Sequence, residues 1–135
     1  MDKLLVLKAI THAFDQKPIF ENLNMAIAEN DVVSIVGASG VGKTTLFNIA
    51  AGLLTPTAGE VWINGVETTG QAGTVGYMLQ KDLLLPFKTV FDNIALPLTL
   101  KGYSKAKIAD IVNPQLPSFG LQGLEHQYPQ TLSGG

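Results

Sequence analysis

The segment at residues 37–44, GASGVGKT, constrains the fold of this chain more than any other. It has the pattern Gly, four residues, Gly, Lys, and then Ser or Thr. Glycines at these places let the backbone curve tightly with positive φ, so that successive N–H groups point at phosphate oxygens. The run before it (31–36, DVVSIV) is typical of a buried strand, and residues 43–53 have helical apolar spacing. Strand, glycine-rich turn and helix in this order predict a phosphate-binding loop at the positive end of the helix dipole.

Two side chains of this loop have defined chemistry. Lys43 is placed to reach the β- and γ-phosphates of a nucleotide, and the hydroxyl of Thr44 can ligate Mg²⁺. The alternative is a glycine-rich turn between a strand and a helix with an incidental Lys. Because the strand and helix context is also met, nucleotide binding is the inference that the pattern favours.

Composition excludes several other classes of protein. The chain has 135 residues, of which 46% are hydrophobic and 15% charged, and this balance argues against disorder. Its net charge of −2, with lysine as every basic residue, gives no basic surface for nucleic acid and no arginine finger. The absence of Cys excludes disulfides and thiolate metal sites. We expect a soluble α/β chain without a signal peptide or a transmembrane segment.

Other elements are predicted from local patterns. Short strands are expected at 4–7, 23–28 and 74–79, the last delivering Gln80 at its carboxyl end, and a hairpin at 59–67 around Asn64–Gly65.

Two further helices are expected in the second half of the chain. Thr89 and Asp92 form a capping box for a helix in which Pro97 should cause a kink or the end, and 104–112 should be helical. The chain stops on LSGG at 132–135, and we interpret this as truncation.

These motifs, in this order, resemble the nucleotide-binding domain of ABC transporter ATPases along the whole chain. Residues 33–67 are similar to that family's Walker A stretch and the hairpin after it. Gln80 matches the Q-loop, and YPQTLSGG (128–135) matches the approach to the ABC signature. The sequence after Gln80 looks most like the nitrate, sulfonate and taurine type of importer ATPase.

The resemblance implies a fold and its division. The fold would be α/β: a P-loop NTPase (ABC ATPase) core, an N-terminal antiparallel β subdomain and the start of a helical subdomain. The chain (1–135) would be the N-terminal portion of one nucleotide-binding domain. Residues 1–30 and 58–72 would form the β subdomain, 31–57 and 73–80 the P-loop core, and 81–135 the Q-loop and helical subdomain up to the signature.

The resemblance also implies the roles of individual residues toward ATP and Mg²⁺. Lys43 and Gln80 would act in catalysis, and Thr44 and Gln80 would hold Mg²⁺. Three groups of residues would bind nucleotide: an aromatic that stacks on adenine, the P-loop, and the signature, which would contact the nucleotide held by a second domain. In that order the residues are Phe14; Gly37, Ala38, Ser39, Gly40, Val41, Gly42, Lys43, Thr44 and Thr45; and Ser133, Gly134 and Gly135. For Phe14 a place in the core is an equal alternative.

The partners implied are of two kinds. A second nucleotide-binding domain would pair head to tail with this one, and a transmembrane permease subunit would contact the apolar loop after Gln80. A solute-binding protein would be an indirect partner, nucleic acid would not be one, and the location would be peripheral, on the cytoplasmic face of the cell membrane. The function implied is that of an ATPase subunit that couples ATP binding and hydrolysis to solute transport, with import expected.

Two alternatives stay open at this point. The Walker B strand and the catalytic Glu of the family are absent from these 135 residues. The chain alone is therefore expected to be inactive, and it could be a module that binds Mg-ATP without turnover. The other alternative is a soluble ABC-type ATPase that is not a transporter.

Overall fold

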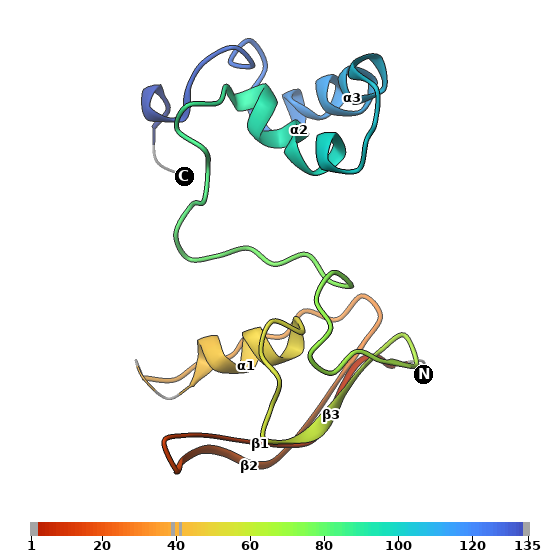
Figure 1. Cartoon of the computed structure of the whole chain (residues 1–135), viewed down its shortest axis with the longest axis vertical. Coiled ribbons are helices and arrows are strands. Elements are labelled where there is room, and N and C mark those ends of the chain that lie inside the picture. The colour runs from red at the N-terminus through yellow and green to blue at the C-terminus, as the bar shows by residue number, and fades with distance from the viewer. Residues whose placement is uncertain (1–2, 39, 41, 134–135) are drawn as a thin grey trace. The chain divides into compact units, whose positions relative to one another are not determined.

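The computed structural model describes residues 3–38, 40 and 42–133, and they divide into two compact units. The first unit spans Met1–Met78 and contains a four-stranded sheet and one helix, whereas the second spans Leu79–Gly135 and is helical (Figure 1). Each unit has its own buried apolar cluster, so each is described by itself.

The sheet of the first unit is antiparallel throughout. Its strand order is β2-β1-β3-β4, with β1 at Lys3–Phe14, β2 at Lys17–Ala28, β3 at Ala58–Ile63 and β4 at Val66–Glu67. The strands expected at 4–7 and 23–28 therefore exist but are 12 residues long each. Pro18 lies inside β2. Proline has no N–H to donate to a second neighbouring strand, but β2 is an edge strand and needs no such bond on its outer side.

Two tight turns close the hairpins. Asp15 and Gln16 connect β1 to β2 with φ of 47° and 66°, the positive values that two-residue hairpin turns use. Asn64 and Gly65 connect β3 to β4 with φ of 50° and 74°, so the hairpin predicted at this dipeptide is confirmed.

A β-bulge interrupts β1 at Ala9. The register shifts there against both neighbouring strands, and Ala9 has a φ of 48°. Its N–H donates to Asn24 Oδ1 at 2.9 Å, and a Cβ at Gly59 would lie 2.5 Å from its carbonyl oxygen. The bulge therefore depends on an Asn side chain in one neighbouring strand and on a Gly in the other.

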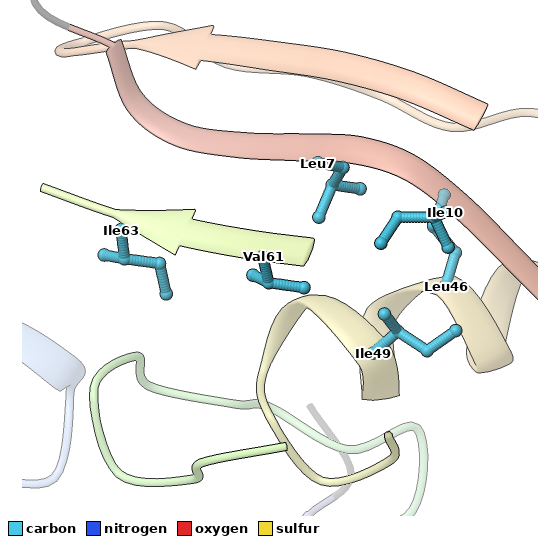
Figure 2. Close-up of a cluster of buried hydrophobic side chains, with 6 residues drawn as sticks. All are labelled: Leu7, Ile10, Leu46, Ile49, Val61 and Ile63. Carbon is cyan, nitrogen blue, oxygen red and sulfur yellow. The ribbon is translucent and has the colours of Figure 1, made fainter. Parts of the chain in front are cut away.

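Helix α1 (Lys43–Ala50) packs on one face of this sheet. Its buried side chains Leu46 and Ile49 meet apolar side chains of β1 and β3 (Figure 2). The complete cluster is Leu7, Ile10, Leu46, Ile49, Val61 and Ile63. The helix was expected to continue to Leu53, but it ends at Ala50, and Leu53 is 57% exposed.

Two predicted strands of the core do not form in the described residues. Residues 31–36 and 74–79 have no strand assignment, although their sequences have strand composition. The physical reason is that a strand needs a hydrogen-bonding partner, and neither segment pairs with another part of the described chain. In the first segment Ile35 packs against the sheet core, whereas Val32 and Val36 are 94% and 90% exposed.

The second unit consists of two helices and three short 3₁₀ turns. Helix α2 spans Val90–Leu100 and α3 spans Lys105–Val112, followed by η1 (Asn113–Gln115), η2 (Pro117–Phe119) and η3 (Pro129–Thr131). Their core is Ala95, Ile108, Val112 and Leu116.

The predicted helix boundaries in this unit hold, with one exception. Thr89 caps α2 by accepting from the N–H of Asp92 at 3.2 Å, and Ser104 caps α3 in the same way. Pro97 was expected to kink or end α2. It does not end the helix, which runs through Pro97 to Leu100, and the kink stays a prediction.

The antiparallel sheet, the helix after the glycine-rich turn and the helical unit confirm the expected fold class. The assignment of individual residue ranges to subdomains stays a prediction. Among the described residues, no helix is both long enough and apolar enough to cross a membrane.

Candidate nucleotide-binding site

The glycine-rich loop leads directly into α1. Gly40 and Gly42 have φ of +85° and +98°, values that side-chain-bearing residues rarely adopt. Gly42 is the N-cap of α1, and its carbonyl accepts the first helical hydrogen bond from the N–H of Leu46 at 2.9 Å. The two glycines thus turn the backbone so that it enters the helix immediately after the loop, as the motif predicts.

The loop is fixed to the sheet at Gly42. A Cβ built on Gly42 would lie 2.4 Å from Cγ2 of Ile19 and 3.0 Å from Cζ of Phe20. Both residues belong to β2, so the second glycine of the motif is required by close packing as well as by its φ. Sequence analysis did not single out Ile19 or Phe20, because nothing local in the sequence links them to the loop.

The N-terminus of α1 fits an anionic ligand. No side chain caps α1 within the described residues, and its first turn contains no acidic residue. The ammonium group of Lys43 donates to the carbonyl oxygen of Gly37 across the loop, while Thr44 is exposed and Thr45 is half-buried. Uncapped helix N–H groups, a Lys ammonium and an exposed hydroxyl form a donor set suited to phosphate and to a hard cation bound with it.

Not every predicted loop residue is described. Gly37 and Ala38 lie in an exposed irregular segment, whereas Ser39 and Val41 lie outside the described residues.

Phe14 is the last residue of β1, at the end of the β1–β2 hairpin. It is 47% exposed, and its ring meets the ring of His12 edge-on with centroids 4.7 Å apart. His12 is buried, and within the described chain neither of its ring nitrogens has a hydrogen-bond partner. An exposed aromatic supported from behind is compatible with base stacking, so the expected role of Phe14 stays a prediction.

The segment that leads to Gln80 is attached to α1. Tyr77 is half-buried, and its hydroxyl donates to Oδ1 of Asn48 at 2.8 Å. Gln80 itself is exposed and belongs to the second unit, so its expected roles stay predictions. The contact between Tyr77 and Asn48 was missed by sequence analysis, since 29 residues separate the two partners.

The segment before the signature is organised by a side chain. The hydroxyl of Thr131 in η3 donates to the carbonyl oxygen of Tyr128 at 2.7 Å, and Ser133 follows as an exposed residue. Gly134 and Gly135, the remaining signature residues, lie outside the described residues.

Hollows elsewhere in the described chain do not include the glycine-rich loop. A hollow of about 590 Å³, lined by Lys3, Leu4, Glu29, Asn64 and Gly65, contains no residue of the loop. The described residues also contain no group of three or more His, Cys, Asp or Glu side chains that could hold a metal ion.

The sheet, the glycine-rich loop and the helix that starts from it define this chain as a P-loop protein with the elements of an ATP-binding cassette. A family model described as ABC transporter matches residues 20–135. The chain belongs to the ABC transporter family.

Curated relatives agree with this assignment. An uncharacterized ABC transporter ATP-binding protein of Methanocaldococcus jannaschii is 40% identical over 85% of this chain and 43% of the relative. A formylaminopyrimidine import ATP-binding protein of Halalkalibacterium halodurans is 37% identical over 98% of this chain and 51% of the relative. A taurine import ATP-binding protein of Yersinia pestis is 33% identical over 98% and 52%. The chain thus spans about half the length of the curated relatives it matches.

Solved structures show the same fold. A dimeric ATP-binding cassette in a post-hydrolysis state, bound to ADP and Pi, has a TM-score of 0.79 and 28% identity, covering 96% of this chain and 63% of that chain. A second cassette structure has a TM-score of 0.84 at 20% identity, which supports the fold alone.

Proposed function

We propose that this chain provides the ATP-binding P-loop of an ABC transporter ATP-binding subunit, which couples ATP binding and hydrolysis to solute import. The observation that carries the proposal is the geometry at Gly42. There a positive φ, close packing on β2 and the start of an uncapped helix coincide at the second glycine of the motif. Membership of the ABC transporter family and its import relatives support the transport role.

Different groups of the loop are proposed to bind the phosphates and the Mg²⁺. The ammonium of Lys43 exchanges the Gly37 carbonyl for the β- and γ-phosphate oxygens, and the backbone N–H groups of 37–45 surround the same oxygens. The hydroxyl of Thr44 and the side-chain oxygen of Gln80 are the proposed ligands of Mg²⁺. When bound, Mg²⁺ supplies positive charge that neutralises the phosphate oxygens during hydrolysis.

Two further contacts complete the proposed nucleotide site. The exposed ring of Phe14 stacks on adenine, a contact worth about 1–3 kcal/mol per base. Ser133, with Gly134 and Gly135, caps the γ-phosphate held by a second copy in a head-to-tail dimer. The dimeric form of a 28% identical cassette supports the presence of a second domain.

The apolar loop, defined here as residues 83–87, is the proposed contact with a transmembrane permease subunit. Leu83 and Phe87 are 73% and 70% exposed, and Leu84 is 47% exposed. Exposed apolar side chains clustered in one loop are typical of a protein interaction site. We therefore place the protein at the cytoplasmic face of the membrane, attached through this partner.

Nucleotide titration of the full-length protein and its Lys43→Ala variant tests the proposal. We expect ATP affinity to fall by about 10- to 150-fold, since charge-assisted hydrogen bonds contribute about 1.5–3 kcal/mol. Lys8→Ala is the matched control, because Lys8 lies over the ring of Trp62 and outside the loop. Wild-type affinity in Lys43→Ala would contradict the proposal, and single-turnover hydrolysis by the full-length protein separates an ATPase from a module that binds without turnover.

A further inference from the structure

The side chain of Asn93 holds the apolar loop in place. Its Oδ1 accepts from the N–H of Leu85 at 2.7 Å, and its Nδ2 donates to the carbonyl oxygen of Leu85 at 3.1 Å. The carbonyl oxygens of Lys88 and Thr89 lie 3.1 and 3.0 Å from the same Nδ2, so its two hydrogens are shared among three carbonyl oxygens. One half-buried amide therefore engages four backbone groups between residues 85 and 89, using both its acceptor and its donors.

These hydrogen bonds pair backbone groups that no helix or strand pairs. Residues 81–85 have no strand or helix assignment, and Leu85 is the half-buried residue between exposed neighbours. Asn93 pairs with both polar backbone groups of Leu85, and the N–H of Lys88 adds a turn by donating to the carbonyl of Leu85 at 3.1 Å. The loop is thus held to α2 at Leu85, while Leu84 and Phe87 on either side of it stay exposed.

The start of α2, which carries Asn93, is itself hydrogen-bonded to another segment. Asn93 lies in the first turns of α2 (Val90–Leu100), and the N–H groups of Val90 and Phe91 donate to the carbonyl oxygens of Gln127 and Glu125 at 2.8 and 3.0 Å. The start of α2 is thus joined both to the apolar loop and to the segment that precedes the signature.

We propose that Asn93 is a positioning residue that preorganises the apolar loop for docking of an apolar segment of a membrane-spanning partner. This inference rests on the proposed function, since that function names the partner. Preorganisation favours binding because the loop loses little conformational freedom when the partner docks. Asn93 touches neither nucleotide nor partner in this scheme, and it acts through the conformation of residues 83–87.

Asn93→Asp is the informative variant. It keeps the size of the side chain and the acceptor for Leu85 N–H, but it replaces the donor to three carbonyl oxygens with an oxygen that repels them. Thr99→Val is the matched control, since it removes another side-chain hydrogen bond within α2, from Thr99 to the carbonyl of Ala95, away from the loop.

The test is photo-crosslinking in the native cells from a benzophenone side chain at position 87 of the full-length protein, with mass spectrometry of the adduct. We expect an adduct with a protein that has several membrane-spanning helices. We expect its yield to fall at least about tenfold in Asn93→Asp and to stay within about twofold of wild type in Thr99→Val. An equal yield in Asn93→Asp, or an adduct confined to proteins without membrane spans, overturns the proposal.

Two further measurements separate positioning from general destabilisation and from failure of the proposed function. Amide hydrogen exchange at Leu85 and Lys88, whose N–H groups are hydrogen-bonded, should rise in Asn93→Asp, with exchange in α3 (Lys105–Val112) unchanged. A rise throughout the second unit overturns a positioning role. ATP affinity should remain at the wild-type value in Asn93→Asp. If the wild-type protein binds ATP but gives no crosslink from position 87, the docking proposal is overturned and the proposed ATP-binding function stands. If the wild-type protein does not bind ATP, the proposed function is overturned.

Discussion

Tyr77 donates a hydrogen bond of 2.8 Å to Asn48 and so connects the segment before Gln80 to the helix that follows the glycine-rich loop. Both side chains are half-buried. Residues 74–79 form no strand in the described chain, and this contact attaches the segment to α1.

Tyr77→Phe should destabilise the protein by about 0.5–1.5 kcal/mol, because it removes one partner of a hydrogen bond and leaves the ring in place. The midpoint of urea unfolding of the full-length protein measures this. Tyr103→Phe, at a more exposed ring, is the control and should change the midpoint little. Equal midpoints for wild type and Tyr77→Phe would show that the bond contributes no net stability.

The two positive-φ glycines of the loop should differ in their tolerance of a methyl group. Gly42→Ala places Cβ 2.4 Å from Ile19 and also strains φ, so we expect a loss of about 2–4 kcal/mol in stability together with weaker ATP binding. Gly40→Ala meets nothing within 4 Å, so the cost should be about 1–2 kcal/mol from φ alone.

A double-mutant cycle identifies the clash at Gly42. Ile19→Ala removes Cγ2, so in its presence the additional cost of Gly42→Ala should approach that of Gly40→Ala. Strict additivity of the two substitutions would place the strain elsewhere.

Phe14→Ala should weaken ATP binding by about 5- to 150-fold, the range expected from loss of one stacking contact. Binding of inorganic tripolyphosphate should not change, because that ligand has no base. Phe14→Trp should retain ATP affinity. Equal losses for ATP and tripolyphosphate would indicate that Phe14 acts through the structure of the hairpin.

Pro97→Ala should stabilise the protein by about 1–3 kcal/mol. Pro97 lies inside α2 and is exposed, so Ala restores a helical N–H and loses little packing. Thermal unfolding measures the change, with Pro86→Ala in the apolar loop as a non-helical comparison. A lower melting temperature for Pro97→Ala would show that the ring makes contacts which outweigh the missing bond.

The sequence predicted those features that depend on neighbouring residues. The start of α1 at the glycine-rich loop, the Asn64–Gly65 turn and the capping of α2 by Thr89 each depend on a few consecutive side chains. The position of Asn93 was also a usable signal. Asn has low helix propensity, and its side chain readily bonds to nearby backbone groups, so an Asn in the first turns of a capped helix indicates such bonds.

Features that depend on distant partners were not predictable in this way. The strand composition of 31–36 is real, but composition cannot supply the hydrogen-bonding neighbour that a strand requires. The bulge at Ala9 depends on Asn24, and the restriction at Gly42 depends on Ile19, both of which lie in β2. In each case the physical cause is a contact between elements, which no local pattern contains.

The antiparallel sheet has a consequence for how the protein folds during synthesis. β1 lies between β2 and β3, and Leu5 pairs with Ile63. Because β1 is made before β3, one edge of β1 stays uncovered until β3 has been synthesised. Until then the β1–β2 hairpin is a nascent segment with an open edge, the kind of surface that chaperones shield. The second unit has no such delay, because its core residues Ala95, Ile108, Val112 and Leu116 lie close together along the chain and can meet as soon as they emerge.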